Sequence, residues 1–168
     1  MREYVGPFFH VLKREEAPLL LRLRQAILEG YLNASDEYRT TKVANYQIQQ
    51  LLRQPNTLPY VIEGPKELMG FLIFCNVFPE WKAEVRLYVW NWEGWGPQRV
   101  RAAQRVFETL WEEAKLQRLG AGTADLRIKK ILTKYFNFQE EGTLLNAFSW
   151  DKKLYNIYLL ARRRIKEN

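Results

Sequence analysis

Two kinds of hydrophobic pattern divide the chain into helical and extended segments. Apolar residues at three-to-four spacing predict amphipathic helices over residues 17–32, 41–53, 98–117 and 126–136. Runs rich in β-branched and aromatic residues predict strands over residues 8–13, 59–63, 68–77, 83–90, 119–125, 142–150 and 154–161. Within residues 83–90, the apolar side chains alternate with Glu84, Arg86 and Tyr88, which indicates a strand with two unlike faces.

The order of these elements predicts one α/β domain over residues 1–168. A strand is followed by two helices, three strands, a helix, a strand, a helix and two strands. This order is typical of a layered architecture in which helices pack on a mixed sheet. A chain of 168 residues suits a single domain, and no repeat, low-complexity segment or long linker divides it.

Composition points to a globular protein. The chain is 47% hydrophobic and 27% charged, and no apolar run approaches the ~18 residues that a membrane span needs. Its first residues contain no apolar segment of the signal-peptide type, so we expect a cytoplasmic protein without a membrane partner. One cysteine, Cys75, and one histidine, His10, disfavour both a disulfide framework and the usual zinc ligand sets. We therefore expect no metal site.

The charge balance indicates an anionic partner. Lysine and arginine number 26 against 19 acidic residues, which gives a net charge of +7. Such a field attracts nucleic acid, an acidic protein surface or the phosphates of a nucleotide cofactor. Nucleic acid is disfavoured, because neither the stacking motif of an RRM nor the GXXG clamp of a KH domain is present. The basic run from Arg162 to Lys166 is interpreted as a solvated tail.

A glycine-containing segment lies where the central strand meets the long helix. Glu93-Gly94-Trp95-Gly96 directly precedes the helix that begins near Pro97. Unpaired N–H groups and the positive end of the dipole at a helix N-terminus can hold phosphate, and glycines allow close approach of the backbone. The segment is neither a P-loop nor a dinucleotide-binding fingerprint, so the glycines alone are also compatible with an ordinary turn.

The C-terminal third carries a resemblance to a known family. Phe138, Glu141-Gly142 and Tyr158 fit a pattern of the GNAT superfamily of acetyl-coenzyme-A-dependent N-acetyltransferases. The sequence resembles most the branch that acetylates ribosomal-protein N-termini, over about residues 68–163. The resemblance implies a GNAT-like fold, acetyl-CoA as the acyl donor, and an amine acceptor that is a small molecule or a peptide N-terminus. Monomer and homodimer both remain open.

The resemblance also implies where the cofactor binds. The backbone of the central strand would orient the thioester, and the start of the long helix would hold the pyrophosphate. The family's Arg or Gln in this loop is replaced by Asn91 or Glu93, so Arg99 and Arg101 are expected to supply the positive charge. Rings of Trp90, Trp92 and Trp95 are candidates to stack on adenine or cover the pantetheine. The implied cofactor-binding residues are Tyr88, Val89, Trp90, Glu93, Gly94, Trp95, Gly96, Pro97, Gln98 and Arg99.

For catalysis, the resemblance implies that Glu84 takes the proton of the amine, directly or through water. Thr133 stands where the family has a tyrosine general acid, and Tyr135 lies about 200° round the helix from it. Tyr155, or alternatively Tyr158, is therefore expected to act as the acid. These departures keep open a non-catalytic GNAT-like binding or regulatory protein, and the charge keeps open a basic nucleic-acid-binding domain.

Overall fold

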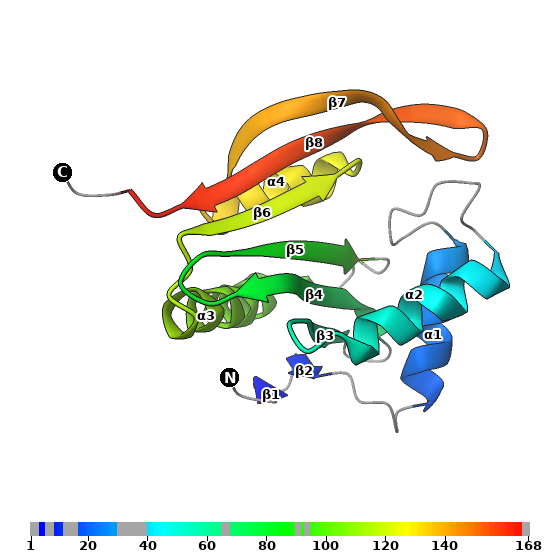
Figure 1. Cartoon of the computed structure of the whole chain (residues 1–168), viewed down its shortest axis with the longest axis horizontal. Coiled ribbons are helices and arrows are strands. Elements are labelled where there is room, and N and C mark those ends of the chain that lie inside the picture. The colour runs from blue at the N-terminus through cyan, green and yellow to red at the C-terminus, as the bar shows by residue number, and fades with distance from the viewer. Residues whose placement is uncertain are drawn as a thin grey trace.

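The described part of the chain folds around one mixed sheet of eight strands (Figure 1). The computed structural model describes residues 4–5, 9–11, 17–29, 40–64, 68–89, 92 and 95–165. The strand order is β1-β2-β3-β4-β5-β6-β8-β7, and only β5 and β6 pair in parallel. The strands are β1 (Tyr4–Val5), β2 (Phe9–Val11), β3 (Leu58–Glu63), β4 (Leu68–Phe78), β5 (Lys82–Val89), β6 (Arg118–Thr123), β7 (Gln139–Trp150) and β8 (Lys153–Arg163).

Helices cover the two faces of the sheet in pairs. The helices are α1 (Ala17–Leu28), α2 (Thr41–Arg53), α3 (Pro97–Glu113) and α4 (Leu126–Tyr135). Buried residues of α3 and α4 form one core cluster with the sheet, while α1 and α2 form a second cluster with other strand residues. The element order and the mixed sheet predicted from the sequence are confirmed, with β1 added at the edge.

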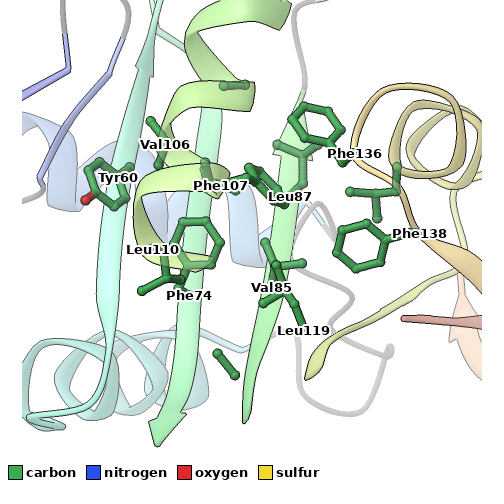
Figure 2. Close-up of a cluster of buried hydrophobic side chains, with 14 of the residues drawn as sticks. Tyr60, Phe74, Val85, Leu87, Val106, Phe107, Leu110, Leu119, Phe136 and Phe138 are labelled. Atoms are coloured by element: carbon green, nitrogen blue, oxygen red, sulfur yellow. The ribbon is translucent and has the colours of Figure 1, made fainter. Parts of the chain in front are cut away.

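The core beneath α3 and α4 is built around aromatic rings (Figure 2). Phe107 of α3 is 1% exposed, and its ring centroid lies 4.4 Å from that of Phe136 and 5.2 Å from that of Phe74. Phe138 approaches the same ring edge-on at 6.2 Å. Such ring pairs add about 0.5–1.5 kcal/mol each to the burial of their area. The aromatic-rich composition therefore serves the core, and this core fixes α3 against the central strands.

The second core cluster lies under α1 and α2. Leu23 of α1 and Ile48 of α2 pack with Phe71 and Ile73 of β4, and Tyr88 of β5 joins them at 5% exposure. The unlike faces predicted for β5 are therefore confirmed at Glu84 and Arg86, which are exposed, but Tyr88 on the same face is buried. Alternation alone could not show that the two N-terminal helices reach as far as Tyr88.

The long helix α3 ends earlier than predicted, at Glu113 in place of residue 117. Lys115 adopts a positive φ of 49°, and the Leu116 N–H donates to the Trp111 carbonyl while the Lys115 N–H donates to Glu112. This is a Schellman ending, in which the left-handed residue is a lysine where glycine is usual. Leu116 then turns inward and is fully buried, which stabilises the early termination.

The prediction that the basic run near the C-terminus is a solvated tail was wrong for Arg162 and Arg164, whereas Arg163 is exposed and Lys166 lies outside the described residues. Arg162 pairs with Glu108 of α3 and stacks 4.4 Å from the Trp111 ring. Arg164 pairs with Glu112 and donates to the carbonyls of Trp111 and Leu116. These side chains attach the end of β8 to α3.

Among the described helices, none has the length and apolarity that crossing a membrane would require.

The edge strand β7 contains a bulge in its middle. Leu144 pairs with Ile157 and Phe148 pairs with Tyr155, so four steps along β7 match two steps along β8. Asn146 in the bulge has a positive φ of 51°, and its N–H donates to the Asn156 side-chain carbonyl at 3.1 Å. An asparagine tolerates this conformation better than most residues. The bulge is therefore a fixed feature of the strand.

A close approach of two central strands gives a test of the fold. A Cβ on Gly70 would lie 1.9 Å from the Tyr88 carbonyl oxygen, so β4 can pack against β5 only with glycine at this position. We expect Gly70→Ala to lower the free energy of unfolding by about 1–3 kcal/mol, the usual cost of overpacking. Gly120→Ala is the control, because a Cβ there meets no atom within 4 Å. Equal stability of the two variants in urea titrations would contradict the register of β4 and β5.

Candidate functional site

The two parallel strands at the centre of the sheet separate before they end. The pairing of β5 with β6 stops at Val85 and Ala121, whereas β4 continues to pair with β5 as far as Val89. Beyond the last pair, β6 pairs only with β8, up to Thr123 opposite Tyr158. The two strands therefore form a V that is open toward their C-terminal ends (Figure 1). Among the described strands, none pairs with the backbone groups that β5 and β6 turn toward this opening.

A cavity of roughly 440 Å³ occupies the opening, which we call the slot. One wall is the end of β5, the opposite wall is the end of β6 with the start of α4, and the far mouth is lined by the β7–β8 hairpin and the residue after α1. Residues lining the slot are Glu29, Leu87, Tyr88, Val89, Thr123, Ala124, Asp125, Leu126, Arg127, Ile128, Phe148, Trp150 and Tyr155.

The wall formed by β6 and α4 is fixed by local hydrogen bonds. The Thr123 hydroxyl accepts the Asp125 N–H at 3.0 Å, and the Asp125 carboxylate caps α4 by accepting the Arg127 N–H at 2.8 Å. Asp125 also forms an ion pair with the Arg127 side chain at 3.3 Å. An N-cap of this kind contributes about 1 kcal/mol to helix stability. The corner thus holds the Arg127 guanidinium at the edge of the slot.

The far mouth of the slot combines aromatic rings with one carboxylate. The half-buried Tyr155 ring lies 6.4 Å from Phe148 and 6.3 Å from Trp150, measured between centroids. Glu29 follows α1, and its carboxylate lies 3.9 Å from the Arg22 guanidinium with the side chain 52% exposed. Ring faces and a carboxylate are groups that attract a cation. This end of the slot therefore suits a positively charged molecule.

The near end of the slot adjoins a second cavity, which we call the outer cavity. It measures roughly 590 Å³ and lies between the start of α3 and the exposed side of α4. Arg127 lines the slot, and its guanidinium lies 4.8 Å from the ring of Trp92, which lines the outer cavity. Basic side chains from both helices line it, together with two tryptophans and a tyrosine: Arg101, Lys130, Lys134, Trp92, Trp95 and Tyr135. The charge of this end favours an anion.

The start of α3 has room for a ligand. Gly96 is the N-cap, no side chain among the described residues caps the helix, and Pro97 occupies the first turn without a lost donor. A Cβ built on Gly96 meets no atom within 4 Å, so free space lies beside this backbone. The positive end of the helix dipole thus faces the outer cavity that Gly96 lines. A pyrophosphate fits this arrangement by charge and by space.

Most of the described residues expected at the cofactor lie at one of the two cavities. Tyr88 and Val89 line the slot, and Trp95, Gly96 and Pro97 line the outer cavity. Gln98 and Arg99 are not among the lining residues, and Arg99 Nε donates to the Glu63 carbonyl at 3.1 Å, toward the end of β3. The predictions for Trp90, Glu93 and Gly94 lie outside the described residues.

The two predicted catalytic residues line different cavities. Tyr155 lines the slot, whereas Glu84 lines a neighbouring groove on the α1 and α2 side of the sheet, and its carboxylate accepts a hydrogen bond from Asn76 at 3.3 Å. Tyr88 lines both cavities. Glu84 lies three residues before Leu87, which is about 10 Å along the strand. A role for Glu84 at the slot therefore requires an intervening water, one of the two routes that the sequence left open.

Sequence reasoning missed the two charged residues at the ends of the slot. Glu29 fell within a predicted helix, and nothing in its local pattern distinguishes it from an ordinary exposed helix residue. Arg127 is the second residue of α4, where the Asp125 cap was the only available signal. Only the folded chain brings these residues to one cavity with Tyr155. The separation between them along the sequence explains why no motif reveals them.

Burial alters the acidity of Tyr88 at the wall of the slot. Desolvation raises the pKa of Tyr88 to about 12, although the nearby Arg86 guanidinium donates a hydrogen bond to the hydroxyl and opposes the rise. Loss of solvation outweighs this contact because the ring is only 5% exposed. The hydroxyl therefore stays protonated throughout the physiological range.

The fold is shared with solved acetyltransferases. No family model matches the chain, and neither does any curated protein sequence. RimL, a ribosomal L7/L12 α-N-protein acetyltransferase solved with coenzyme A, is 15% identical with a TM-score of 0.68, over 96% of this chain and 97% of that one. Spermidine N-acetyltransferase from Vibrio cholerae, solved with coenzyme A and spermine, is 14% identical with a TM-score of 0.62, over 92% and 94%.

Aminoglycoside 6′-acetyltransferase type Ii is also similar, at 18% identity and a TM-score of 0.61, over 95% of this chain and 99% of that one. Similarity of nearly complete chains at such low identity establishes a common fold. The chain therefore has the acyl-CoA N-acyltransferase fold, also called the GNAT fold, as its sequence predicted.

The burial of Tyr88 predicts a dependence of stability on alkaline pH. The pKa of Tyr88 is raised above its value of about 10 in the unfolded chain. The contribution of the buried hydroxyl to the free energy of unfolding is therefore complete below pH 10 and is lost as the pH rises toward 12. Over this range we expect the free energy of unfolding to fall less in Tyr88→Phe than in the wild type. The difference between the two falls should be on the order of 2 kcal/mol in total. Tyr46→Phe is the control, because Tyr46 is 64% exposed. Identical pH slopes in urea titrations of both variants would contradict the burial of the hydroxyl.

Proposed function

We propose that the protein is an N-acetyltransferase that transfers the acetyl group of acetyl-CoA to a primary amine. The observation that carries this proposal is the slot between β5 and β6, which adjoins a basic cavity at the start of α3 and carries a carboxylate among aromatic rings at its far mouth. Such a passage lets an anionic donor and a cationic acceptor enter from opposite ends. The acetyltransferases that share the fold give the proposal independent support.

The residues present fit coenzyme A. The open space at Gly96 and the uncapped start of α3 suit the pyrophosphate, and the basic side chains of the outer cavity suit the remaining phosphate. The narrower slot suits the pantetheine arm, whose amides can pair with the free edges of β5 and β6. When bound, the cofactor supplies a thioester whose acetyl carbon is open to attack.

The acceptor would enter at the mouth lined by Glu29 and Tyr155. An alkylammonium group is attracted by the Glu29 carboxylate and by the ring faces beside it. We propose that the acceptor is a small cationic amine or a peptide N-terminus. The relatives acting on spermidine, an aminoglycoside and a ribosomal protein span these classes. We place the reaction in the cytoplasm.

The proposed reaction needs one base and one acid from this chain. The amine must lose a proton before it attacks, and Glu84 would remove it through water, held in place by the hydrogen bond from Asn76. The thiolate that leaves must gain a proton, and the Tyr155 hydroxyl would donate it from the far mouth of the slot. Leu87 and Val89 would orient the thioester carbonyl through their backbone groups.

A second candidate is a GNAT-like protein that binds the cofactor without catalysis. Leu126 and Thr133 occupy positions where the family has a polar contact and a general acid. Leu126 lines the slot with 61% of its surface exposed, and the Thr133 hydroxyl donates only to carbonyls of its own helix, those of Lys129 and Lys130. In this candidate the slot would still bind acetyl-CoA, and no amine would accelerate release of the thiol.

Binding of the cofactor is tested at Gly96. We expect the wild-type protein to bind acetyl-CoA in calorimetric titrations, and Gly96→Asp to weaken the affinity by about tenfold or more, because the carboxylate would occupy the free space and repel phosphate. Gly96→Ala is the matched control, because its methyl group meets no protein atom. No heat with the wild type at millimolar acetyl-CoA would refute the proposed function.

Catalysis is tested by conservative substitutions measured through thiol release with polyamines, aminoglycosides and peptides. We expect Tyr155→Phe and Glu84→Gln to lower kcat by on the order of a hundredfold, as for loss of a general acid or base. Glu29→Gln should instead raise the KM for cationic acceptors. Tyr135→Phe should leave kcat nearly unchanged, because Tyr135 lines the outer cavity and not the slot.

Two results would decide against this assignment. A kcat abolished by Tyr135→Phe would show that the acid lies on α4, not on β8. Cofactor binding without turnover for any amine would favour the non-catalytic candidate. Glu80→Gln serves as the control for the carboxylate substitutions, since Glu80 is exposed in the β4–β5 turn at the opposite end of β5.

A further inference from the structure

Half of the sheet has an open face on the side where α1 and α2 lie. The core cluster beneath these two helices takes its strand residues from β3, β4 and β5: Val61, Phe71, Ile73 and Tyr88. Among the described residues, none of β6, β7 or β8 belongs to this cluster. Figure 1 shows both helices at the β3 side of the sheet, away from β7. This face of the last three strands is therefore accessible to another molecule.

A groove and a ridge lie side by side on the open face. The groove is the one that Glu84 lines; it measures roughly 610 Å³, and we call it the sheet groove. Gly120 of β6 lines it, and a Cβ there would meet no atom within 4 Å, which leaves a hollow. Leu159 and Ile157 of β8, with Leu144 opposite Ile157 on β7, form what we call the ridge.

The ridge is apolar and accessible. Leu144 is 48% exposed and Leu159 is 36% exposed, while Ile157 is half-buried. A Cβ on Gly122 would lie 3.5 Å from Ile157 and 3.7 Å from Leu159, so both side chains stand directly beside the floor of the groove. Contiguous apolar side chains surrounded by polar ones typically mark a protein–protein interface.

The rim of the sheet groove carries charges of both signs. The Glu141 carboxylate accepts a hydrogen bond from Arg118 at 2.8 Å and lies 3.6 Å from Arg163. Lys82 pairs with Arg118 across the parallel strands, and Glu84 follows Lys82 on the same face. A wholly acidic partner would meet two carboxylates here. Copies of a chain with a net charge of +7 repel each other in general, but this mixed rim can pair with itself.

We propose that the open face is the interface of a homodimer, in which the ridge of each copy fills the sheet groove of the other. The four strands lie in the order β5-β6-β8-β7. A two-fold axis parallel to them places β8 of each copy over β6 of the other, and β7 over β5. Leu159 then fills the hollow above Gly120, and Glu141 lies opposite Lys82. This inference is independent of the proposed function.

The centre of this interface lies away from the slot. Lys82 and Gly120 come before the last parallel pair, Val85 with Ala121, whereas the slot opens beyond that pair. The start of α3 and the outer cavity lie with α3 and α4 on the opposite face of the sheet. Association of two copies and binding of acetyl-CoA can therefore be measured separately.

The first experiment measures the mass of the full chain by sedimentation equilibrium over a range of micromolar concentrations. We expect the wild type to have twice the mass of one chain. Leu159→Glu and Gly120→Glu should raise the dissociation constant of the dimer by about thirtyfold or more, as for loss of a central contact. Ile165→Glu is the matched control, because Ile165 is 91% exposed at the end of β8, outside the sheet groove. Thermal melting followed by circular dichroism verifies that each variant is folded.

The second experiment reverses the charges of the pair that the two-fold axis brings together. We expect Lys82→Glu and Glu141→Lys each to raise the dissociation constant by about fivefold or more, and the double variant to recover most of the affinity. Glu141→Lys also removes the pair with Arg118 inside its own chain. A merely structural effect of that loss would not be rescued by Lys82→Glu.

Every outcome supports or overturns the inference. A dimer that is weakened by Leu159→Glu and Gly120→Glu but not by Ile165→Glu supports it. A wild type with the mass of one chain up to millimolar concentration would overturn it. A dimer that both substitutions leave intact would assign association to another surface. A monomer that binds polyglutamate, and loses this binding in Gly120→Glu, would assign the face to an acidic partner instead. Two unrescued charge reversals would overturn the two-fold arrangement.

Discussion

The structure depends on how far the parallel pairing between β5 and β6 extends. It ends at Val85 and Ala121, while the antiparallel neighbours of both strands continue. The apolar face of β5 stays packed on α3 through Leu87 and Val89, so β5 cannot follow β6. β6 is held by β8 and turns into α4 at the capped Asp125. In a regular sheet, hydrogen bonds would join β5 and β6 along this part of their length. Here the contacts on either side of the two strands hold them apart.

The sequence predicted the elements well because their amphipathic patterns are strong. It predicted less well the features that depend on contacts between distant segments. The burial of Tyr88 needs α1 and α2, and the pairing of Arg162 with Glu108 needs the end of β8 to lie on α3. The end of α3 at Glu113 depends on the left-handed conformation of Lys115, which a lysine in the sequence does not predict.

The same distinction applies to the candidate site. The glycine segment before α3 predicted from sequence the end of the site where we propose that the cofactor binds, because a strand, a glycine and a helix N-terminus are local features. The far mouth could not be found this way, because Glu29 and Tyr155 come from opposite ends of the chain. Arg99 illustrates a third case, in which the residue type was suitable but its side chain is bonded to the Glu63 carbonyl.

The bulge in β7 affects how the edge of the sheet can interact with other molecules. β7 is the last strand of the sheet and 12 residues long, a length at which a regular edge could recruit the edge of another molecule. Asn146, held by Asn156, interrupts the row of backbone groups that such pairing would need. Leu145 beside it is 75% exposed, yet it lies where the edge is irregular. The bulge thus protects an apolar edge against strand-to-strand aggregation.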